Sequence, residues 1–297
     1  MKICYNNGMI DELLARLQAA YPHDFARIRE GLTGKRTVSL RVNPLKTTVD
    51  DVRAAFAQHG IRCETRSFYA DALVLPDVRE DAVKALPVYE RGEIYLQNLS
   101  SMLPPLALAP AAGENILDMT AAPGGKTTQL YALSQGKALI TACERDTGRY
   151  ERLRYNLAKQ GATRVNALKT DAAALDDFLS FDKILLDAPC TGSGTVENGN
   201  IRFSQAYLEK CVRMQRRLLQ KAFTMLKRNG LLVYSTCSVL PEEDEEAVRF
   251  AQQLGAVPVP VPSFADVPRL PSPDGTLCVC PDGTYEGFFL AAFTKRS

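Results

Sequence analysis

The chain has 297 residues, of which 46% are hydrophobic and 24% charged, and its formal net charge is +2. This composition is typical of a globular protein with a sizeable core, and it excludes nucleic-acid binding through overall charge alone. No run of roughly 18 apolar residues predicts a membrane span, and residues 1–7 lack the layout of a secretory signal. We therefore expect a cytoplasmic protein that makes no contact with membranes.

The first third of the chain alternates between helical and strand-like patterns, which predicts a small α+β unit. The expected elements are a helix around residues 13–20, a strand at 37–42, a helix at 52–60 and a strand at 72–75, the last followed by a loop to residue 88. We assign residues 1–105 to this N-terminal domain.

From about residue 113 onward, strands and helices alternate regularly. The expected strands are residues 115–118, 138–143, 164–168, 183–187 and 231–234. One helix is expected to begin near residue 126, and three further helices are expected at residues 146–160, 205–227 and 242–254. Asn229-Gly230 is expected to close the long helix, and residues 288–293 predict a late strand that closes the sheet. This alternation predicts an α/β domain at residues 106–297, whose parallel sheet is covered on both faces and binds ligands beyond the strand ends.

A glycine turn, DMTAAPGGKT at residues 118–127, follows the first of these strands. Gly124 and Gly125 let the backbone approach a ligand, and their amides lie at a helix N-terminus. The segment also matches the end of the phosphate loop G-x-x-x-x-G-K-[ST]. Thr120 stands where that loop needs its first glycine, so a GTPase or ATPase is the weaker interpretation.

Two acidic residues follow the next two strands. Glu144 lies about 20 residues beyond the turn, where a carboxylate accepts hydrogen bonds from ribose hydroxyls. Asp171 is placed to reach an adenine amino group, and it could equally be a helix cap. With the glycine turn, these acids predict a cofactor that carries a nucleoside.

Two cysteines follow the last two strands of the series, Cys190 in DAPC and Cys237 in STCS, and the acidic run PEEDE comes after the second. A generic buried cysteine is a small hydrophobe, but a position just beyond a strand end favours chemistry. A thiolate that adds to carbon 6 of cytosine makes carbon 5 able to attack an electrophilic methyl group. Asp187 could bind the N3 or N4 edge of the ring, and the second thiol could help to remove the proton from carbon 5.

Cys278 and Cys280 form an isolated pair, and the two histidines, His23 and His59, both lie in the N-terminal third. In a strand both cysteines would point to the same face, so we interpret them as packing residues. We expect no metal site and no disulfide framework.

Together, the glycine turn, DAPC and STCS resemble the Sun (Fmu-type) family of RNA cytosine-5 methyltransferases, and the match covers most of the chain. Residues 40–46 and 95–102 resemble its N-terminal RNA-binding element, and residues 283–290 resemble its closing hairpin. The resemblance implies a Rossmann-like methyltransferase that depends on S-adenosylmethionine and carries a small N-terminal α+β RNA-binding domain.

The resemblance also implies roles for particular residues. Cys237 would be the nucleophile, Cys190 would assist release of the methylated RNA, and Lys126 would lie close to the target base. Glu144 would bind the ribose, Asp171 would lie near the adenine and Asp187 beside the pocket. Further cofactor contacts would come from the turn, namely Thr120, Ala121, Ala122, Pro123, Gly124, Gly125 and Lys126. The family usually has Cys where this chain has Thr120, and residues 197–200 are less basic than usual.

RNA is the expected partner, with ribosomal RNA favoured and transfer RNA as the alternative. DNA is not expected, because a DNA enzyme would place its nucleophile in a Pro-Cys-Gln setting, whereas Thr191 follows Cys190. A non-catalytic RNA-binding assembly factor is a further alternative, against which both cysteines, Asp187 and Lys126 argue. We expect a monomer. Candidate RNA contacts are Arg41, because of its motif, and two basic helix faces that could equally be solvated, Arg145, Arg149, Arg152 and Arg154 on one and Arg213, Arg216, Arg217 and Lys221 on the other.

Overall fold

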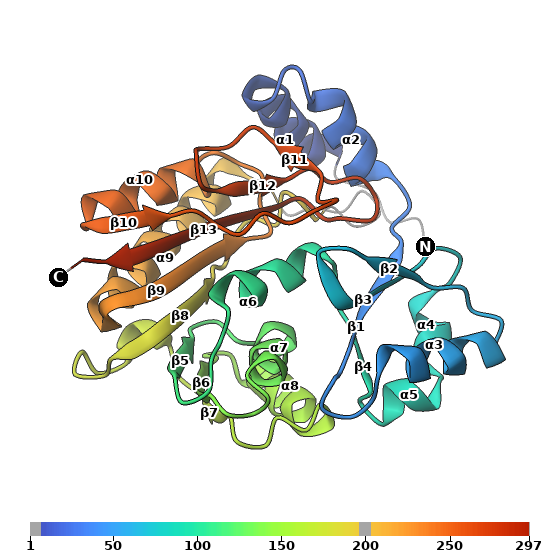
Figure 1. The fold of residues 1–297 in the computed structure, drawn as a ribbon. Helices are drawn as coiled ribbons and strands as arrows, with labels where there is room; N and C mark the ends of the chain where they lie inside the picture. The colour runs from blue at the N-terminus through green and yellow to red at the C-terminus, as the bar shows by residue number, and fades with distance from the viewer. Residues whose placement is uncertain (1–6, 196–202, 297) are drawn as a thin grey trace.

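The computed structural model describes residues 7–195 and 203–296, and Figure 1 shows its two sheets. The smaller sheet has the strand order β2-β3-β1-β4. Its elements are β1 (Val38–Val42), α3 (Val49–Gln58), β2 (Glu64–Arg66), β3 (Tyr69–Leu75), α4 (Glu80–Lys84), α5 (Pro87–Glu90) and β4 (Ile94–Leu96). A separate apolar core, with Leu40, Phe56 and Leu73 fully buried, holds this unit together.

One prediction for this unit is wrong. The segment expected to be a loop up to residue 88 contains the short helices α4 and α5. A helix of one turn is too short to display the apolar period that identifies a helix in sequence. The strand expected at residues 72–75 begins earlier, at Tyr69.

The larger sheet has nine strands within the described residues. Their order is β11-β12-β13-β9-β8-β5-β6-β7, and β10 pairs with β13. The strands β5 to β9 run parallel, whereas β13 is antiparallel to β9. Their bounds are β5 Asn115–Asp118, β6 Leu139–Cys143, β7 Asn166–Leu168, β8 Phe181–Asp187, β9 Leu226–Thr236, β10 Ala256–Val259, β11 Arg269–Leu270, β12 Leu277–Val279 and β13 Phe288–Lys295.

Helices cover both faces of this sheet (Figure 1). One face carries α1 (Asn7–Ala20), α2 (Phe25–Thr33), α9 (Gln205–Met225) and α10 (Glu245–Gln253), and the other carries α6 (Leu103–Leu108), α7 (Gly125–Leu133) and α8 (Thr147–Lys159). The short 3-10 helices η1 (Ser100–Met102) and η2 (Ala172–Ala174) lie in connections. The predicted Rossmann-like α/β fold with a small N-terminal α+β unit is confirmed.

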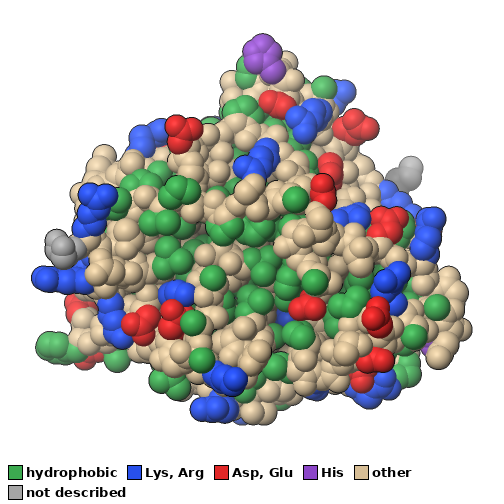
Figure 2. Space-filling view, viewed as in Figure 1, with side chains coloured by type: hydrophobic (Ala, Val, Ile, Leu, Met, Phe, Trp, Pro, Cys, Tyr) green, Lys and Arg blue, Asp and Glu red, His purple; other side chains and the backbone are tan. Residues whose placement is uncertain are grey.

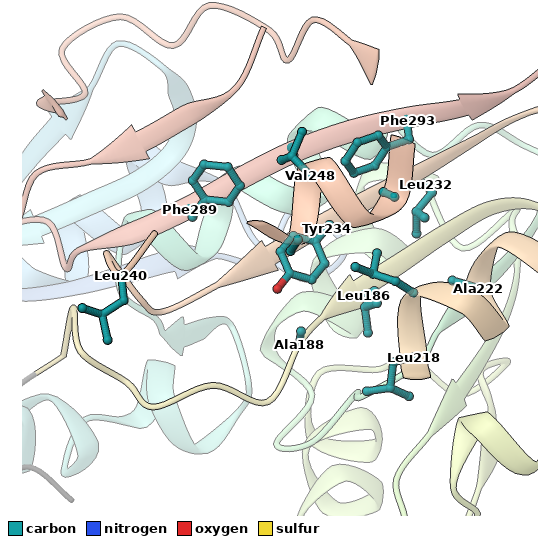
Figure 3. Close-up of a cluster of buried hydrophobic side chains, with 14 of the residues drawn as sticks. Leu186, Ala188, Leu218, Ala222, Leu232, Tyr234, Leu240, Val248, Phe289 and Phe293 are labelled. Carbon is teal, nitrogen blue, oxygen red and sulfur yellow. The ribbon is translucent and has the colours of Figure 1, made fainter. Parts of the chain in front are cut away.

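The core beneath α9 shows why this helix is amphipathic. Leu218 and Ala222 point at Leu186 of β8 and Leu232 of β9 (Figure 3), and all four are at most 3% exposed. Each buried leucine stabilises the fold by about 1.5–3 kcal/mol relative to an exposed one. This packing fixes α9 over the strands whose ends carry the two cysteines.

The end of α9 differs from the prediction. The helix ends at Met225, and Asn229-Gly230 lies inside β9 rather than at a helix end. Asn229 has φ of 59°, and the pairing of β9 with β8 shifts register between Phe181 and Lys183. A helix end and a β-bulge both use a residue with positive φ, so the dipeptide suits either, and pairing with β8 selects the bulge.

Cys278 and Cys280 are both buried in the same core cluster, as a packing role requires. Within the described ranges, no three His, Cys, Asp or Glu side chains are grouped to hold a metal ion. The helices in the same ranges are all too short or too polar to span a membrane.

Candidate active site

The two cysteines that follow β8 and β9 lie side by side. The strands pair in parallel with Asp187 opposite Ser235, so the loops that leave them start at the same edge of the sheet. Both thiols are half-buried and free, and the Sγ atoms of Cys190 and Cys237 are 3.1 Å apart. Parallel neighbours therefore bring together two thiols that are 47 residues apart in the chain.

The two thiols are in different electrostatic settings. The hydrogen bond to Cys237 raises the pKa of Cys190, and burial and the charges of Cys237 and Glu243 raise it further. The raised pKa favours the neutral thiol form of Cys190, and either sulfur can donate in the contact between the two cysteines. A thiolate is the nucleophilic form of cysteine, so the raised pKa argues against Cys190 as the nucleophile of the pair.

An ion pair lies next to the thiols. Lys126 Nζ is 2.8 Å from Asp187 Oδ2, and the same ammonium lies over the ring of Phe288. Burial, the largest single contribution, lowers the pKa of Lys126, but the charge and hydrogen bond of Asp187 together with the charges of Cys237 and Asp118 raise it overall. Lys126 therefore remains a cation beside the sulfur. The other oxygen of Asp187 accepts a hydrogen bond from Ser235 Oγ at 2.8 Å, which fixes the carboxylate plane.

A cavity of about 300 Å³ opens at these strand ends. It brings together four of the residues predicted to bind a cofactor, Thr120, Glu144, Asp171 and Asp187, with both cysteines. Its wall is completed by apolar side chains that include Met119, Met214 and Leu218. Residues 121–126 do not line it, although Lys126 reaches its edge through Asp187.

The two acids in the cavity already have local partners. Glu144 Oε1 accepts from the backbone N–H of Asp146, and Asp171 Oδ1 accepts from that of Ala173. Asp171 is thus an N-cap of η2, as the cap interpretation expected, and it also lines the cavity. One carboxylate accepts more than one hydrogen bond, so capping and ligand binding are compatible.

The glycine turn is fixed by its contacts with neighbouring elements. Gly124 has φ of 109°, which favours glycine, and the Cβ of any other residue would come within 3.1 Å of Leu153. Thr127 Oγ1 donates to the buried Asp118 at 2.7 Å, which ties the start of α7 to the end of β5. These contacts fix the backbone of the turn at Gly124 and at the start of α7.

Arg41 does not form an RNA-binding surface, contrary to the prediction. The side chain is 0% exposed, and its guanidinium donates to Gln97 at 3.2 Å and to Thr128 at 3.0 Å. It lies over the ring of Tyr95. Arg41 therefore joins the N-terminal sheet to the first turn of α7 and supports the glycine turn.

The basic face of α9 is neutralised by neighbouring acids. Its cations pair with carboxylates throughout, namely Arg213 with Glu209, Arg216 with Glu246, Arg217 with Asp171 and Lys221 with Asp177. On α8 and the loop before it, Arg145 and Arg152 are exposed, and no ion pair within the described part of the chain involves them. Figure 2 shows positive and negative side chains interspersed on the viewed face, with no large basic patch there. The less basic segment at residues 197–200 lies outside the described residues.

Glu243 is a buried site residue to which the sequence assigned no role. It follows β9 in the acidic run after Cys237, and its Oε1 accepts from the backbone N–H of Thr191 at 2.9 Å. The loops are joined again by Ser193 Oγ and Ser238 Oγ, 2.8 Å apart. In the sequence, Glu243 could be noticed only because it follows an apolar segment and precedes the start of a helix. An acidic residue at such a position is usually interpreted as an exposed helix cap.

Two family models match this chain and identify its family. The model of the 16S rRNA methyltransferase RsmB/F family matches residues 105–294, and that of a RsmF/B-like ferredoxin-like domain matches residues 12–79. The chain belongs to the RsmB/F family. The resemblance to Sun-type methyltransferases in the sequence is thereby confirmed.

The family's curated members are longer than this chain. The ribosomal RNA small subunit methyltransferase F of Shewanella sp. (strain ANA-3) is 34% identical over 269 residues, which is 86% of this chain and 56% of that protein. The methyltransferase B of Pasteurella multocida is 36% identical over 244 residues, 79% of this chain and 54% of that protein. The chain thus spans about half the length of the curated relatives it matches.

Two solved structures match over nearly the whole chain. A methyltransferase homolog protein from Pyrococcus horikoshii is 32% identical with a TM-score of 0.84, over 97% of this chain and 99% of that one. NSun6 from the same organism, solved with SFG, is 21% identical with a TM-score of 0.86, over 97% and 98% of the two chains, and shows the shared fold.

Proposed function

We propose that this chain methylates carbon 5 of a cytosine in small-subunit ribosomal RNA, with S-adenosylmethionine as the methyl donor. The observation that carries the proposal is the pair of thiols, 3.1 Å apart, at the edge of a cavity beside the Lys126–Asp187 ion pair. Membership of the RsmB/F family supports the RNA class, because its curated relatives are small-subunit ribosomal RNA methyltransferases.

The cavity fits the proposed cofactor in size and in donor set. Pockets for small ligands begin at about 300 Å³ and combine apolar walls with a few polar groups. Glu144 would accept from the ribose hydroxyls and Asp171 from the adenine amino group, with Thr120 at the glycine turn. S-adenosylmethionine supplies an electrophilic methyl group when it is bound. Residues 121–125 of the turn do not line the cavity, so Thr120 is the turn residue proposed to contact the cofactor there.

Cys237 is the proposed nucleophile. Its thiolate would add to carbon 6 of the cytosine, and the electron pair displaced from the ring double bond would make carbon 5 nucleophilic. Asp187 would accept from the N4 amino group, and the Lys126 ammonium would offset the charge that develops on the ring. Fixed charges of this kind act strongly because the site is partly shielded from water.

Cys190 is the proposed base for release. While Cys237 is a free thiolate, its hydrogen bond and its charge hold the proton on Cys190. Adduct formation converts Cys237 to a thioether, so both contributions disappear and the pKa of Cys190 falls. Cys190 would then release its proton to solvent, its thiolate would take the proton from carbon 5, the bond between carbon 6 and sulfur would break, and the Cys237 thiolate would be regenerated. The order of events would thus be set by the contact between the thiols.

The N-terminal unit, residues 1–105, is the proposed RNA-binding domain, with the exposed Arg145 at the cavity and the exposed Arg152 on α8 as further contacts. Arg145 lines the cavity, so it is placed to meet a phosphate next to the target nucleotide. Transfer RNA would be the substrate if the trapping experiment below recovered it instead.

The test is to express Cys190→Ala and Cys237→Ala in a bacterial host and to run each on a denaturing gel with and without ribonuclease. We expect a slower, ribonuclease-sensitive band for Cys190→Ala and none for Cys237→Ala. Sequencing the trapped RNA would identify the substrate. A band that appears only when Cys190 is retained would reverse the two roles. A folded Cys190→Ala that binds S-adenosylmethionine but forms no adduct with host RNA or with 16S ribosomal RNA would favour the assembly-factor alternative.

A further inference from the structure

A buried carboxylate connects the loops that carry the two cysteines. Glu243 is 0% exposed and lies between β9 and α10. Both of its oxygens accept hydrogen bonds from Thr191, the residue after Cys190: Oε1 from the backbone N–H at 2.9 Å and Oε2 from the hydroxyl. A buried carboxylate is costly unless hydrogen bonds compensate for lost hydration, so this pairing is a specific arrangement rather than a surface contact.

The residue before Cys190 is held by the same carboxylate through one intermediary. Gln215 Nε2, on α9, donates at 3.0 Å to Glu243 Oε1 and at 3.0 Å to the carbonyl oxygen of Pro189. Glu243 is itself fixed, because the hydroxyl of Tyr234 on β9 donates to its carbonyl oxygen at 2.7 Å. Both neighbours of Cys190 are therefore tied to one buried side chain.

We propose that Glu243 is a positioning residue for the release step, which holds Cys190 where it can remove the proton from carbon 5. The inference rests on the proposed function of the two cysteines. A general base must lie within about 2.6–3.2 Å of the proton's heavy atom, and a misplacement of about 1 Å costs on the order of 100-fold in rate. Without the carboxylate, both neighbours of Cys190 would lose these contacts, and within the described residues the loop would be held only further along, at Ser193 and Gly194.

The hydrogen bonds of Glu243 fall mostly on the loop that carries Cys190. Its carboxylate accepts two hydrogen bonds from Thr191 and is linked through Gln215 to Pro189, whereas on the Cys237 side only the hydroxyl of Ser238, among the described residues, acts on it. Loss of the carboxylate should therefore displace Cys190 more than it displaces the nucleophile. The expected signature is normal methyl transfer followed by slow release.

The experiment compares Glu243→Ala with the parent chain and with Leu219→Ala. Leu219 lies on α9 one turn beyond Gln215, is 1% exposed and does not line the cavity, so its truncation lowers stability without touching the loop. Methyl transfer is followed in a single turnover with labelled S-adenosylmethionine and 16S ribosomal RNA, and the adduct is followed on denaturing gels. In Glu243→Ala we expect release to slow by about tenfold or more and methyl transfer by less than about threefold. Leu219→Ala should release RNA as the parent does.

Two further variants keep the inference falsifiable if Glu243→Ala does not fold. Glu243→Gln keeps the shape and one accepting oxygen, and Thr191→Val removes the hydroxyl contact but keeps the backbone one. Each should accumulate labelled, methylated adduct to an intermediate extent. Equal slowing of transfer and release in the folded variants, or equal adduct in Leu219→Ala, would overturn the inference.

The Cys190→Ala variant separates this inference from the proposed function. If Cys190→Ala traps RNA and the Glu243 and Thr191 variants do not, only the positioning role fails. If Cys190→Ala traps no RNA and the parent transfers no methyl group, the proposed function fails and this inference fails with it.

Discussion

Asp118 makes the stability of this protein depend on pH in a predictable way. The side chain ends β5 beneath the glycine turn and is 1% exposed. Burial raises the pKa of Asp118 from 3.8 to about 6, and the charge of Asp187 adds to the increase despite opposing contributions from Thr127 and Lys126. The folded state therefore holds this proton more tightly than the unfolded state.

The sign and size of the effect follow from this difference in pKa. Because the folded state binds more protons between pH 3.8 and about 6, the free energy of unfolding falls as the pH rises through that window. A difference of about two pH units corresponds to about 3 kcal/mol. Below the window Asp118 is protonated in both states, and above it the full destabilisation is present.

The perturbation that isolates this effect is Asp118→Asn, which keeps the size and an acceptor for Thr127 but cannot ionise. Urea unfolding of both proteins at several pH values from about 4 to about 7 gives the difference in free energy of unfolding, in which the other titrating groups cancel. We expect the variant to gain about 3 kcal/mol relative to the parent over this range. A difference that stays constant with pH, or that favours the parent as the pH rises, would refute the reasoning.

Two further substitutions test the packing and the electrostatics of the site. In Gly194→Ala the new Cβ would lie 2.1 Å from the carbonyl oxygen of Gly287, so the backbone must shift, and we expect thermal denaturation to show a loss of about 2 kcal/mol or more. In Lys126→Met the cation 2.8 Å from Asp187 is lost, and we expect adduct formation to slow by about 100-fold in a quenched time course in the Cys190→Ala background.

Each of these substitutions has a matched control. Gly148 lies on the helix α8, and in Gly148→Ala the new Cβ would lie 3.5 Å from the side chain of Asp146. This variant should be as stable as the parent or more stable by up to about 1 kcal/mol. Lys183→Met removes a cation that pairs with Glu114 at 3.0 Å, at the opposite end of β8, and should leave adduct formation unchanged. The steric argument fails if both glycine variants are equally stable, and the electrostatic one fails if Lys183→Met slows the reaction as Lys126→Met does.

Much of the larger sheet could be predicted because its elements are long or strongly patterned. The strand at Asn115–Asp118 was predicted to the residue, and the helix Thr147–Lys159 was bounded closely because Asp146 is an N-cap that accepts from the N–H of Arg149. The helices Glu80–Lys84 and Pro87–Glu90 and the strands Glu64–Arg66 and Ile94–Leu96 were missed. Elements of three to five residues carry no complete period, so only their tertiary contacts define them.

The site divides in the same way. Residues just beyond strand ends were predicted to converge, and the meeting of Cys190 with Cys237 follows from parallel pairing of two neighbouring strands. The burial of Arg41 and the contacts of Glu243 could not be predicted, because a charged residue in sequence is most often solvent-exposed. Their partners, such as Thr128 and Thr191, are distant in the chain.

The sequence by itself therefore determined the alternation of strands and helices, the glycine turn, the two cysteines and the family to which they belong. These features are local, since backbone conformation and apolar period depend on neighbouring residues. Only the tertiary structure decided that Lys126 pairs with Asp187, that Arg41 supports the glycine turn and that Glu243 holds the Cys190 loop. Such contacts depend on strand order and register, which set which distant side chains share a buried space and must satisfy one another's charges and hydrogen bonds.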